Sequence, residues 1–317
     1  MKDFRYSAVL LLLALTAFWP GSAATEPGPL VTPEWLSQNL DRDDLVVLDI
    51  RSAIGGASRW TYVSGHVPGA VYSDYVGHDW HDRDSEVPAT LPAVEQIESL
   101  LGGLGISNDS MVVVVHSGVH SSDFSTAARV YWIFKLMGHD RVAILDGGFR
   151  NWEAAGLPVE RGWNAPTAAT FSASLRPELL ADTQQVLAAV EHGAQLVDAR
   201  ARELYLGLEK AELAARYGTI PGAHNIPHQD MIDAESGRVI SPRQLASLLR
   251  ELELSAEHDT IVFCSIGHWS AATWFALREL AAFDNVRLYD GSMVEWTKAP
   301  ERPVELGVEV GQGLSPP

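Results

Sequence analysis

Thiols and positive charges are both scarce in this chain of 317 residues, which has one cysteine and 23 basic side chains against 41 acidic ones. A single cysteine forms no disulfide within the chain and builds no thiolate zinc site by itself. The net charge of −18 argues against a nucleic-acid binder and against docking on anionic lipid. The cysteine is left with burial as a small hydrophobe, an intermolecular disulfide, or chemistry.

Long hydrophobic runs are also missing, apart from one near the start of the chain. Hydrophobic residues nevertheless make up 46% of the sequence, which excludes a mainly disordered protein. The length predicts about two domains, since a typical domain has roughly 100–200 residues.

The first 24 residues have the pattern of a secretory signal peptide. Two basic residues come first, the apolar run 8–18 follows, and Ser22, Ala23 and Ala24 are the small residues that a signal peptidase requires. A membrane anchor is the alternative, but a spanning helix needs about 20 residues. We therefore expect cleavage after Ala24, no membrane contact afterwards, and a periplasmic or secreted protein whose net charge changes from −18 to −19.

The rest of the sequence contains an internal duplication with a spacing of about 150 residues. Four motifs of the first half recur in the same order in the second half, at offsets between 144 and 153 residues. The matched pairs are Asp49-Ile50-Arg51 with Asp198-Ala199-Arg200, 65–70 with 218–223, 111–115 with 260–263, and 146–152 with 290–296. A repeat of this length predicts two copies of one domain and not a solenoid.

Each copy alternates short β-branched runs with helical patterns. In the second copy, the apolar run 261–263 precedes a helical pattern at 270–281 and a further run at 286–289. Continuous apolar strands joined by helices predict an α/β fold in which each domain is a parallel sheet flanked by helices.

The expected boundaries follow from these patterns. We expect a first domain at 30–160, a linker near 161–170, a second domain at 172–305 and a flexible tail at 306–317.

The only cysteine, Cys264, lies between the predicted strand 261–263 and the predicted helix that begins at Ser270. In open parallel sheets the functional crevice lies at the carboxyl ends of the strands. Unpaired N–H groups and the positive end of the helix dipole favour a thiolate there. Gly267 permits the turn that points successive N–H groups inward. The alternative is a buried free thiol in a core strand.

With these motifs the sequence resembles the tandem-domain rhodanese family of sulfurtransferases. The resemblance covers nearly the whole chain after the signal peptide and rests on 49–51, 65–70, 147–152, their second copies, and Cys264 before Gly267. In that family the first domain is usually inactive and the second carries the nucleophilic cysteine. The resemblance places Ser117, which has no thiol, at about the equivalent position of the first copy.

The resemblance implies that Cys264 attacks the outer sulfur of a small anionic donor such as thiosulfate, or alternatively 3-mercaptopyruvate. A thiophilic acceptor such as cyanide or a thiol then takes the sulfur, and a protein acceptor remains open. The persulfide would be cradled by the N–H groups of the loop residues Ser265, Ile266, Gly267, His268, Trp269 and Ser270. No metal or organic cofactor is implied.

Cell-cycle tyrosine phosphatases share this fold and also use a cysteine in a cradle loop. Their loop ends in an arginine six positions after the cysteine, because phosphate needs a bidentate cation. Here Ser270 occupies that position, and no basic residue occurs between Cys264 and Trp274. A phosphatase is therefore disfavoured.

The uncharged loop also weakens the assignment of the donor. Rhodaneses that act on thiosulfate usually have basic residues in this loop, and Leu204 replaces an arginine that family members often carry. Lys210 or Arg216 could compensate, or they could be plain surface charges. The missing cation motivates a second hypothesis, a non-catalytic binding or redox module that retains the fold.

Two residues of the loop have two possible roles each, and two residues outside it are expected to support it. His268 could be the titratable donor of the loop or an exposed loop histidine. Trp269 could line the pocket or pack between the domains. Asp198 and Arg200 are expected to form a structural ion pair or hydrogen bond that braces the loop.

The segment 77–84 contains two histidines, His78 and His81, that could bind zinc or copper together with nearby acids. The segment has no helical pattern and belongs to the first domain, so a solvated loop is the favoured interpretation. Trp152 and Trp296 are expected to pack as core anchors of the two copies.

Overall fold

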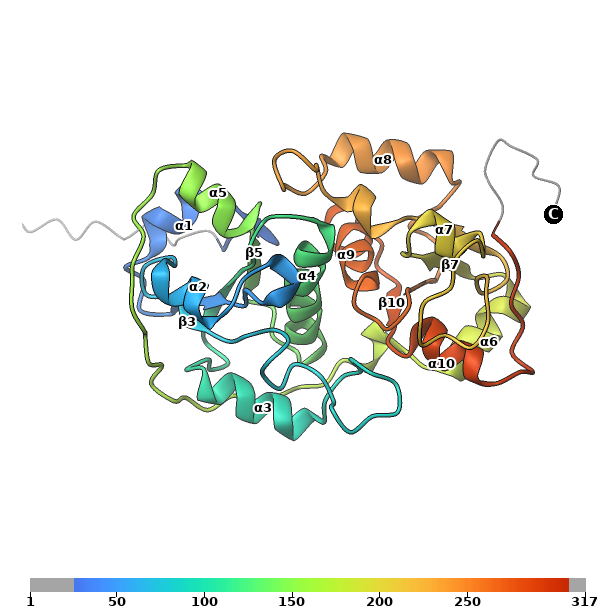
Figure 1. Ribbon diagram of the computed structural model, residues 1–317, viewed down its shortest axis with the longest axis horizontal. Coiled ribbons are helices and arrows are strands. Elements are labelled where there is room, and N and C mark those ends of the chain that lie inside the picture. Colours follow the sequence, from blue (N-terminus) through green and yellow to red (C-terminus); the bar gives the residue numbers. More distant parts are fainter. Residues whose placement is uncertain (1–25, 308–317) are drawn as a thin grey trace, which may run out of the picture.

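The computed structural model describes residues 26–307, so the predicted signal peptide and residues 308–317 of the predicted tail lie outside the described residues. The described part contains two five-stranded parallel sheets with the strand orders β1-β5-β4-β2-β3 and β6-β10-β9-β7-β8. The two orders are the same arrangement repeated, with helices around each sheet (Figure 1). The predicted α/β fold with two matching domains is confirmed.

The first copy is built on β4, whose five residues are all buried because helices cover both faces of the sheet. The strands of this copy are β1 (Leu30–Val31), β2 (Leu45–Asp49), β3 (Val71–Tyr72), β4 (Met111–Val115) and β5 (Val142–Leu145). Its helices are α1 (Pro33–Asn39), α2 (Arg59–Ser64), α3 (Val94–Gly103), α4 (Ser121–Leu136) and α5 (Gly148–Ala154), with a short 3-10 turn at Ala53–Gly55.

The second copy repeats this arrangement around β9, which is also buried throughout. Its strands are β6 (Leu180–Ala181), β7 (Gln195–Asp198), β8 (Ala223–Asn225), β9 (Thr260–Phe263) and β10 (Val286–Tyr289). Its helices are α6 (Thr183–His192), α7 (Arg202–Tyr205), α8 (Pro242–Glu251), α9 (Ser270–Phe275) and α10 (Ser292–Lys298), with 3-10 turns at Pro177–Leu179 and His228–Met231. Helix α9 continues as a π-helical turn at Ala276–Leu280.

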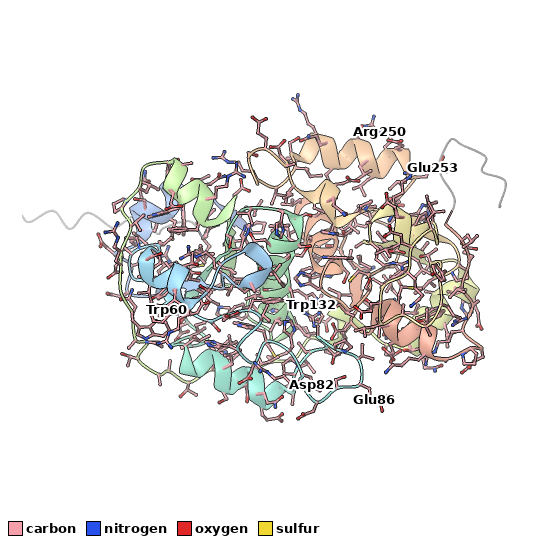
Figure 2. All side chains as sticks on the ribbon, in the orientation of Figure 1. Trp60, Asp82, Glu86, Trp132, Arg250 and Glu253 are labelled. Atoms are coloured by element: carbon pink, nitrogen blue, oxygen red, sulfur yellow. The ribbon has the colours of Figure 1, made fainter. Side chains whose placement is uncertain are left out.

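Helices α4 and α9 lie side by side between the two sheets (Figure 1). The ring of Phe275 on α9 packs edge-on against Phe124 and Tyr131 of α4, with centroid distances of 5.8 and 5.0 Å. One continuous hydrophobic core includes buried residues of both copies. Trp132, which Figure 2 shows on α4, is fully buried and donates its indole N–H to the carbonyl of Leu179. The copies therefore form one packed body.

A loop of the first copy, residues 73–93, makes a second connection between the copies. Figure 2 shows two of its residues, Asp82 and Glu86, at the lower side of the molecule. The Glu86 carbonyl accepts a hydrogen bond of 3.1 Å from Lys298 of α10. Tyr75 and Trp80 are 1% and 0% exposed. The interpretation of 77–84 as a solvated loop holds for most of that segment, since His78, Asp79, Arg83 and Asp84 are exposed. It was wrong for Trp80, whose side chain packs in the hydrophobic core.

The two histidines of this loop do not form a metal site in the described chain. Within residues 26–307, no group of three or more His, Cys, Asp or Glu side chains is placed to hold a metal ion. His78 contacts the hydroxyl of Ser73, and His81 packs edge-on against Tyr75 at a centroid distance of 4.6 Å.

The repeated tryptophans are core anchors, as predicted. Trp152 and Trp296 are both fully buried, and their indole N–H groups donate to the carbonyls of Pro158 and Pro303 at 2.8 and 2.7 Å. Of the helices between residues 26 and 307, none combines the length and the apolar character that crossing a membrane requires.

Candidate active site

Cys264 lies directly after β9, the central strand of the second sheet, and is fully buried. Residues 264–269, here called the cysteine loop, lead from β9 into α9. The loop is tied to the start of α10, because the carbonyls of Cys264 and Ser265 accept hydrogen bonds from Met293 and Val294 at 3.1 and 3.0 Å. The cysteine thus lies at the carboxyl edge of a parallel sheet, where ligands bind in this class of fold.

The cysteine loop has an unusual number of backbone donors without an acceptor. Among the described residues, five N–H groups between positions 265 and 270 donate no hydrogen bond. They belong to Ser265, Ile266, His268, Trp269 and the first residue of α9, Ser270. The hydroxyls of Ser265 and Ser270 are also buried without a partner. A buried polar group without a partner costs about 1–3 kcal/mol, so such a cluster suits an acceptor that arrives from outside. That the acceptor is a persulfide stays a prediction.

Ser292, which the sequence did not single out for a role, holds the cysteine loop in shape. Its hydroxyl accepts from the N–H groups of Cys264 and Gly267 at 3.0 and 3.1 Å and donates to the carbonyl of Tyr289 at 2.8 Å. Its backbone has a φ of 50°, the left-handed region that favours glycine. The only sequence signal was its place in the repeated motif that begins at Asp290.

Gly267 is required by its backbone and by its neighbours. Its φ is +77°, and a Cβ atom at this position would lie 2.4 Å from Oδ1 of Asp290 and 2.7 Å from the Asp290 carbonyl oxygen. The left-handed turn therefore both shapes the cysteine loop and lets it approach Asp290 closely.

Asp290 connects the cysteine loop to a cation from the first copy. Nη1 of Arg129, on α4, lies 2.7 Å from Oδ1 of Asp290, and both side chains are buried. Burial lowers the pKa of Arg129, but the carboxylate of Asp290 outweighs it and leaves that pKa raised, with smaller contributions from Tyr75 and Cys264. The positive charge that the loop sequence lacks is thus supplied on its buried side by another domain.

His268 joins the two copies. Its Nε2 lies 3.0 Å from the carbonyl of Ser122, and its Nδ1 lies 2.9 Å from the hydroxyl of Tyr75. Because a carbonyl only accepts, Nε2 carries the proton and Nδ1 accepts from Tyr75. Burial lowers the pKa of His268 to about 3, so the ring is neutral at pH 7. The prediction of an exposed loop residue is therefore wrong, since the ring is not exposed and both of its nitrogens have partners. The role of titratable donor stays a prediction, which the lowered pKa disfavours.

Trp269 fills both of the roles considered for it. Its indole N–H donates to the hydroxyl of Ser122 of the first copy at 2.8 Å, and its ring stacks on His228 at a centroid distance of 4.6 Å. It also lines the cavity above Cys264.

Asp198 and Arg200 form a buried ion pair, with Nη2 of Arg200 at 2.5 Å from Oδ2 of Asp198. The pair contacts the carbonyl of Gly218 and the hydroxyl of Thr219, not residues 264–270. Asp49 and Arg51 make the same pair in the first copy, where Arg51 reaches the carbonyl of Gly65. We therefore correct the expected brace: it holds the Gly218 turn, because the arginine side chain extends away from the cysteine loop.

A cavity of about 480 Å³ opens at Cys264 and is lined by residues of both copies. Most of the lining is apolar, and Glu212 is the only charged residue in it. The lining residues are Ile54, Ser122, Leu204, Ala211, Glu212, Leu213, Cys264, Ser265, Ile266, His268, Trp269 and Val294. Lys210 and Arg216, the cations considered as compensation, are absent from this lining.

Strand pairing changes the residue that corresponds to Cys264 in the first copy. Asp49 pairs with Val115 in the first sheet, and its counterpart Asp198 pairs with Phe263 in the second. The residue after Val115 is His116, so His116 and not Ser117 is the equivalent of Cys264. The motif offsets differ by several residues, and only the register of the strands settles the position.

In the first copy, a side chain of the protein itself occupies the loop that corresponds to the cysteine loop. The carboxylate of Asp123 accepts from the N–H groups of Ser117, Gly118 and Val119 at 3.2, 2.6 and 3.3 Å and contacts Nδ1 of His116 at 3.0 Å. Burial raises the pKa of Asp123, but His116 and these N–H groups outweigh it, so the pKa is lowered. The first loop therefore has no thiol, and Asp123 already occupies the N–H groups of Ser117, Gly118 and Val119.

Comparison with known proteins agrees with this geometry. A family model described as the rhodanese-like domain matches residues 32–155 and again residues 182–299. A "Putative thiosulfate sulfurtransferase" of Mycobacterium leprae (strain TN) is 34% identical over 285 residues, which cover 88% of this chain and 98% of that protein. The 3-mercaptopyruvate sulfurtransferase of Escherichia coli (strain K12) is 30% identical over 281 residues, covering 87% and 97%.

Two solved structures give the same picture of the fold. The crystal structure of SseA from Escherichia coli, described with the rhodanese fold of 3-mercaptopyruvate sulfotransferases, aligns with a TM-score of 0.73 and 29% identity over 84% of this chain and 99% of that one. The crystal structure of YnjE aligns with a TM-score of 0.75 and 26% identity over 89% of this chain and 69% of that one.

Proposed function

Because the chain belongs to the rhodanese family and is a sulfurtransferase of the thiosulfate or 3-mercaptopyruvate type, we propose that it carries the transferred sulfur as a persulfide on Cys264. One observation carries the proposal: the only thiol of the chain lines a cavity from a loop in which the N–H groups of Ser265, Ile266, His268 and Trp269 have no acceptor. A thiolate and a persulfide anion are both acceptors that such a loop stabilises.

The reaction has two displacement steps. In the first, the Cys264 thiolate attacks the outer sulfur of thiosulfate, a sulfur–sulfur bond forms, and the bond to sulfite breaks with its electron pair leaving on sulfite. In the second, a thiophilic acceptor attacks the outer sulfur of the persulfide and Cys264 leaves as a thiolate. The thiol is regenerated without an external oxidant or reductant.

The protein contributes position and charge to these steps. Ser292 and Gly267 fix the shape of the cysteine loop, while the N–H groups of the residues around Gly267 stay free. The ion pair of Arg129 with Asp290 fixes the residue that packs against Gly267 of the loop. Preorganised donors stabilise developing anionic sulfur without rearrangement during the reaction.

We propose thiosulfate as the donor, with 3-mercaptopyruvate as the alternative, since relatives of similar identity are named for each. The purified protein is incubated with either donor, separated from it, and its intact mass is measured. The expected result is a gain of one sulfur atom, absent in Cys264→Ser. Comparing the rates at equal donor concentration decides between the donors.

The second candidate is a binding or redox module without transfer activity, favoured by the cation-free lining of the cavity and by Leu204 in it. It predicts that neither donor adds sulfur to Cys264. A sulfur adduct with either donor that disappears on adding cyanide or a thiol contradicts it.

We propose that the protein is exported, on the basis of the signal-peptide pattern of residues 1–24. The full-length chain expressed in a bacterial host is expected in the periplasmic fraction, with an N-terminus at Thr25 by mass spectrometry of the N-terminal peptide. An intact N-terminus at Met1 in the cytoplasmic fraction would contradict export.

A further inference from the structure

The cavity above Cys264 has a polar floor and apolar walls. The floor is the cysteine loop with its free N–H groups, which lie next to the transferred sulfur. The walls include Leu204 and Leu213, from the segment that contains α7 and the residues after it, and Trp269, from the end of the cysteine loop. At about 480 Å³ the cavity is in the size range of sites that enclose whole organic molecules. A small inorganic donor would occupy the floor and leave the walls without a ligand.

The walls offer nothing to a negatively charged ligand. Glu212 is the only charged lining residue, and it is exposed at the rim. The ring of His268 is neutral at pH 7, since burial lowers its pKa to about 3. An anionic group between these walls would lose water without gaining a counter-charge, and it would meet the repulsion of Glu212.

The two cations that the sequence offered as compensation are occupied elsewhere. The ammonium of Lys210 is held by the backbone carbonyls of Ala211, Glu212 and Ala214. The guanidinium of Arg216 donates to the carbonyls of three residues near the end of α10, which are Thr297, Ala299 and Arg302. Neither side chain lines the cavity, so the walls supply no counter-charge to an anionic group held between them, in contrast to a small donor that stays on the floor.

We propose that the sulfur acceptor of this enzyme is an organic thiol with an apolar body and no anionic group, either neutral or positively charged. The inference rests on the proposed persulfide chemistry of Cys264. The thiol sulfur reaches the polar floor, the apolar body packs against Leu204, Leu213 and Trp269, and a positive group is favoured at the rim by Glu212.

The transfer step balances without a further reactant. The acceptor thiolate attacks the outer sulfur of the Cys264 persulfide, and a sulfur–sulfur bond forms in the acceptor. The bond between the two sulfurs of the enzyme persulfide breaks, and its electron pair returns to Cys264 as a thiolate. The proton that the acceptor thiol gives up on forming its thiolate goes to the transferred sulfur, so the product is an organic hydropersulfide.

The test follows the discharge of sulfur from the full chain. The protein is loaded with sodium polysulfide, desalted and checked for the sulfur adduct by intact mass. It is then mixed with one of four thiols: 2-phenylethanethiol, 2-mercaptoethanol, cysteamine or mercaptoacetate. Loss of the adduct is timed by quenching, at equal thiolate concentrations. Dividing the rate of each variant by that of the wild type removes the intrinsic reactivity of each thiol.

In the wild type, 2-phenylethanethiol is expected to discharge the adduct about tenfold faster than 2-mercaptoethanol, because its ring is buried against the walls. Glu212→Gln should raise the rate of discharge by mercaptoacetate roughly threefold and lower the rate with cysteamine to a similar extent. The rate with 2-mercaptoethanol should not change. Leu204→Arg should raise the rate of discharge by mercaptoacetate about tenfold and lower the rate with 2-phenylethanethiol.

The matched control is Leu208→Arg, because Leu208 is 70% exposed on the same segment and does not line the cavity. Its rates should stay within about twofold of the wild type for all four thiols. If Leu204→Arg does not fold, as judged by circular dichroism, Leu204→Ala replaces it and should slow only 2-phenylethanethiol.

Two results overturn the inference while the proposed function stands. One is a loaded protein that mercaptoacetate discharges as fast as cysteamine, with no effect of Glu212→Gln. The other is equal discharge by 2-phenylethanethiol and 2-mercaptoethanol. If polysulfide, thiosulfate and 3-mercaptopyruvate all fail to load Cys264, the proposed function and the inference fall together.

Discussion

At the scale of single residues, the candidate site depends on two small ones that contain no reactive group. Gly267 lets the cysteine loop approach Asp290, and Ser292 satisfies the two N–H groups that point away from the cavity. The remaining donors of the loop are left free for a ligand. The chemistry proposed for Cys264 therefore depends on residues that shape its loop.

Gly267→Ala is expected to cost at least about 2 kcal/mol in the free energy of unfolding, since the left-handed backbone and the contact with Asp290 both oppose a Cβ. Sulfur transfer should fall with it. Gly193→Ala is the matched control, because Gly193 has a φ of +74° but no heavy atom within 4 Å of a Cβ. Urea unfolding measures both. Equal losses would show that the loop tolerates the side chain and would contradict the account.

Ser292→Ala is expected to leave the N–H groups of Cys264 and Gly267 without an acceptor, at a cost of about 1–3 kcal/mol for each group. The rate of persulfide formation should fall by about tenfold or more, since the loop loses its fixed shape. Quenched time courses of persulfide formation measure the rate, and urea unfolding measures the loss of stability. Ser99→Ala, at an exposed position of α3, should change neither. An unchanged rate in Ser292→Ala would remove Ser292 from the positioning residues.

At the scale of elements, α4 is the part of the first copy that completes the site of the second. It brings Ser122 to His268 and Trp269, and Arg129 to Asp290. The first copy therefore serves as the support of the second, and its own loop is closed by Asp123.

Arg129→Met is expected to destabilise the protein by about 3–5 kcal/mol, because the carboxylate of Asp290 stays buried without its partner. Adding Asp290→Asn should recover part of that stability but not the rate of sulfur transfer. The control is Arg176→Met, which removes a partly exposed pair with Asp140 and should cost under about 1 kcal/mol. A double variant with the wild-type rate would show that the ion pair only stabilises the fold.

The elements themselves could be predicted from the sequence because their signals are local. Apolar runs such as 111–115 and 261–263 indicate buried parallel strands, and the repeat doubles the evidence for each. The place of Cys264 follows from the strand before it and the helix after it. The equivalence of Cys264 with His116 could not be predicted, since a shift of one residue in a loop leaves the motifs intact.

At the scale of the whole molecule, the contributions of the first copy were beyond sequence analysis. Tyr75, Ser122 and Arg129 lie at least 135 residues before the cysteine loop in the sequence. Ser122 and Arg129 reach the site because α4 packs on α9, and Tyr75 reaches His268 from the loop 73–93. No periodicity encodes how two domains dock. The role of His268 was missed for the same reason, because both of its hydrogen-bond partners belong to the first copy.

The docking of the copies also predicts a response of stability to acid. Burial lowers the pKa values of His81 and His228 to about 4 and that of His268 to about 3. Their ordinary value in an unfolded chain is about 6.5. The unfolded state therefore binds more protons between these values. The neutral histidines make their full contribution to the free energy of unfolding above about pH 6.5. That free energy falls as the pH drops toward 4, by up to about 1.4 kcal/mol per pH unit for each histidine.

Urea unfolding at pH 7.5, 6.5 and 5.5 measures this slope. His228→Asn should reduce the slope, and His258→Asn should leave it unchanged because His258 is exposed. A wild-type protein equally stable at pH 7.5 and 5.5 would contradict the neutral, buried state of these three histidines.

The central claim, that sulfur is carried on Cys264 above a cradle of free N–H groups, has one direct test. The intact mass of the protein is measured after incubation with thiosulfate and, separately, with 3-mercaptopyruvate, followed by peptide mapping of the adduct. The account predicts the gain of one sulfur atom at Cys264, lost on adding a thiol and absent in Cys264→Ser. An unchanged mass with both donors, in a protein that is folded and has a free thiol, would contradict it.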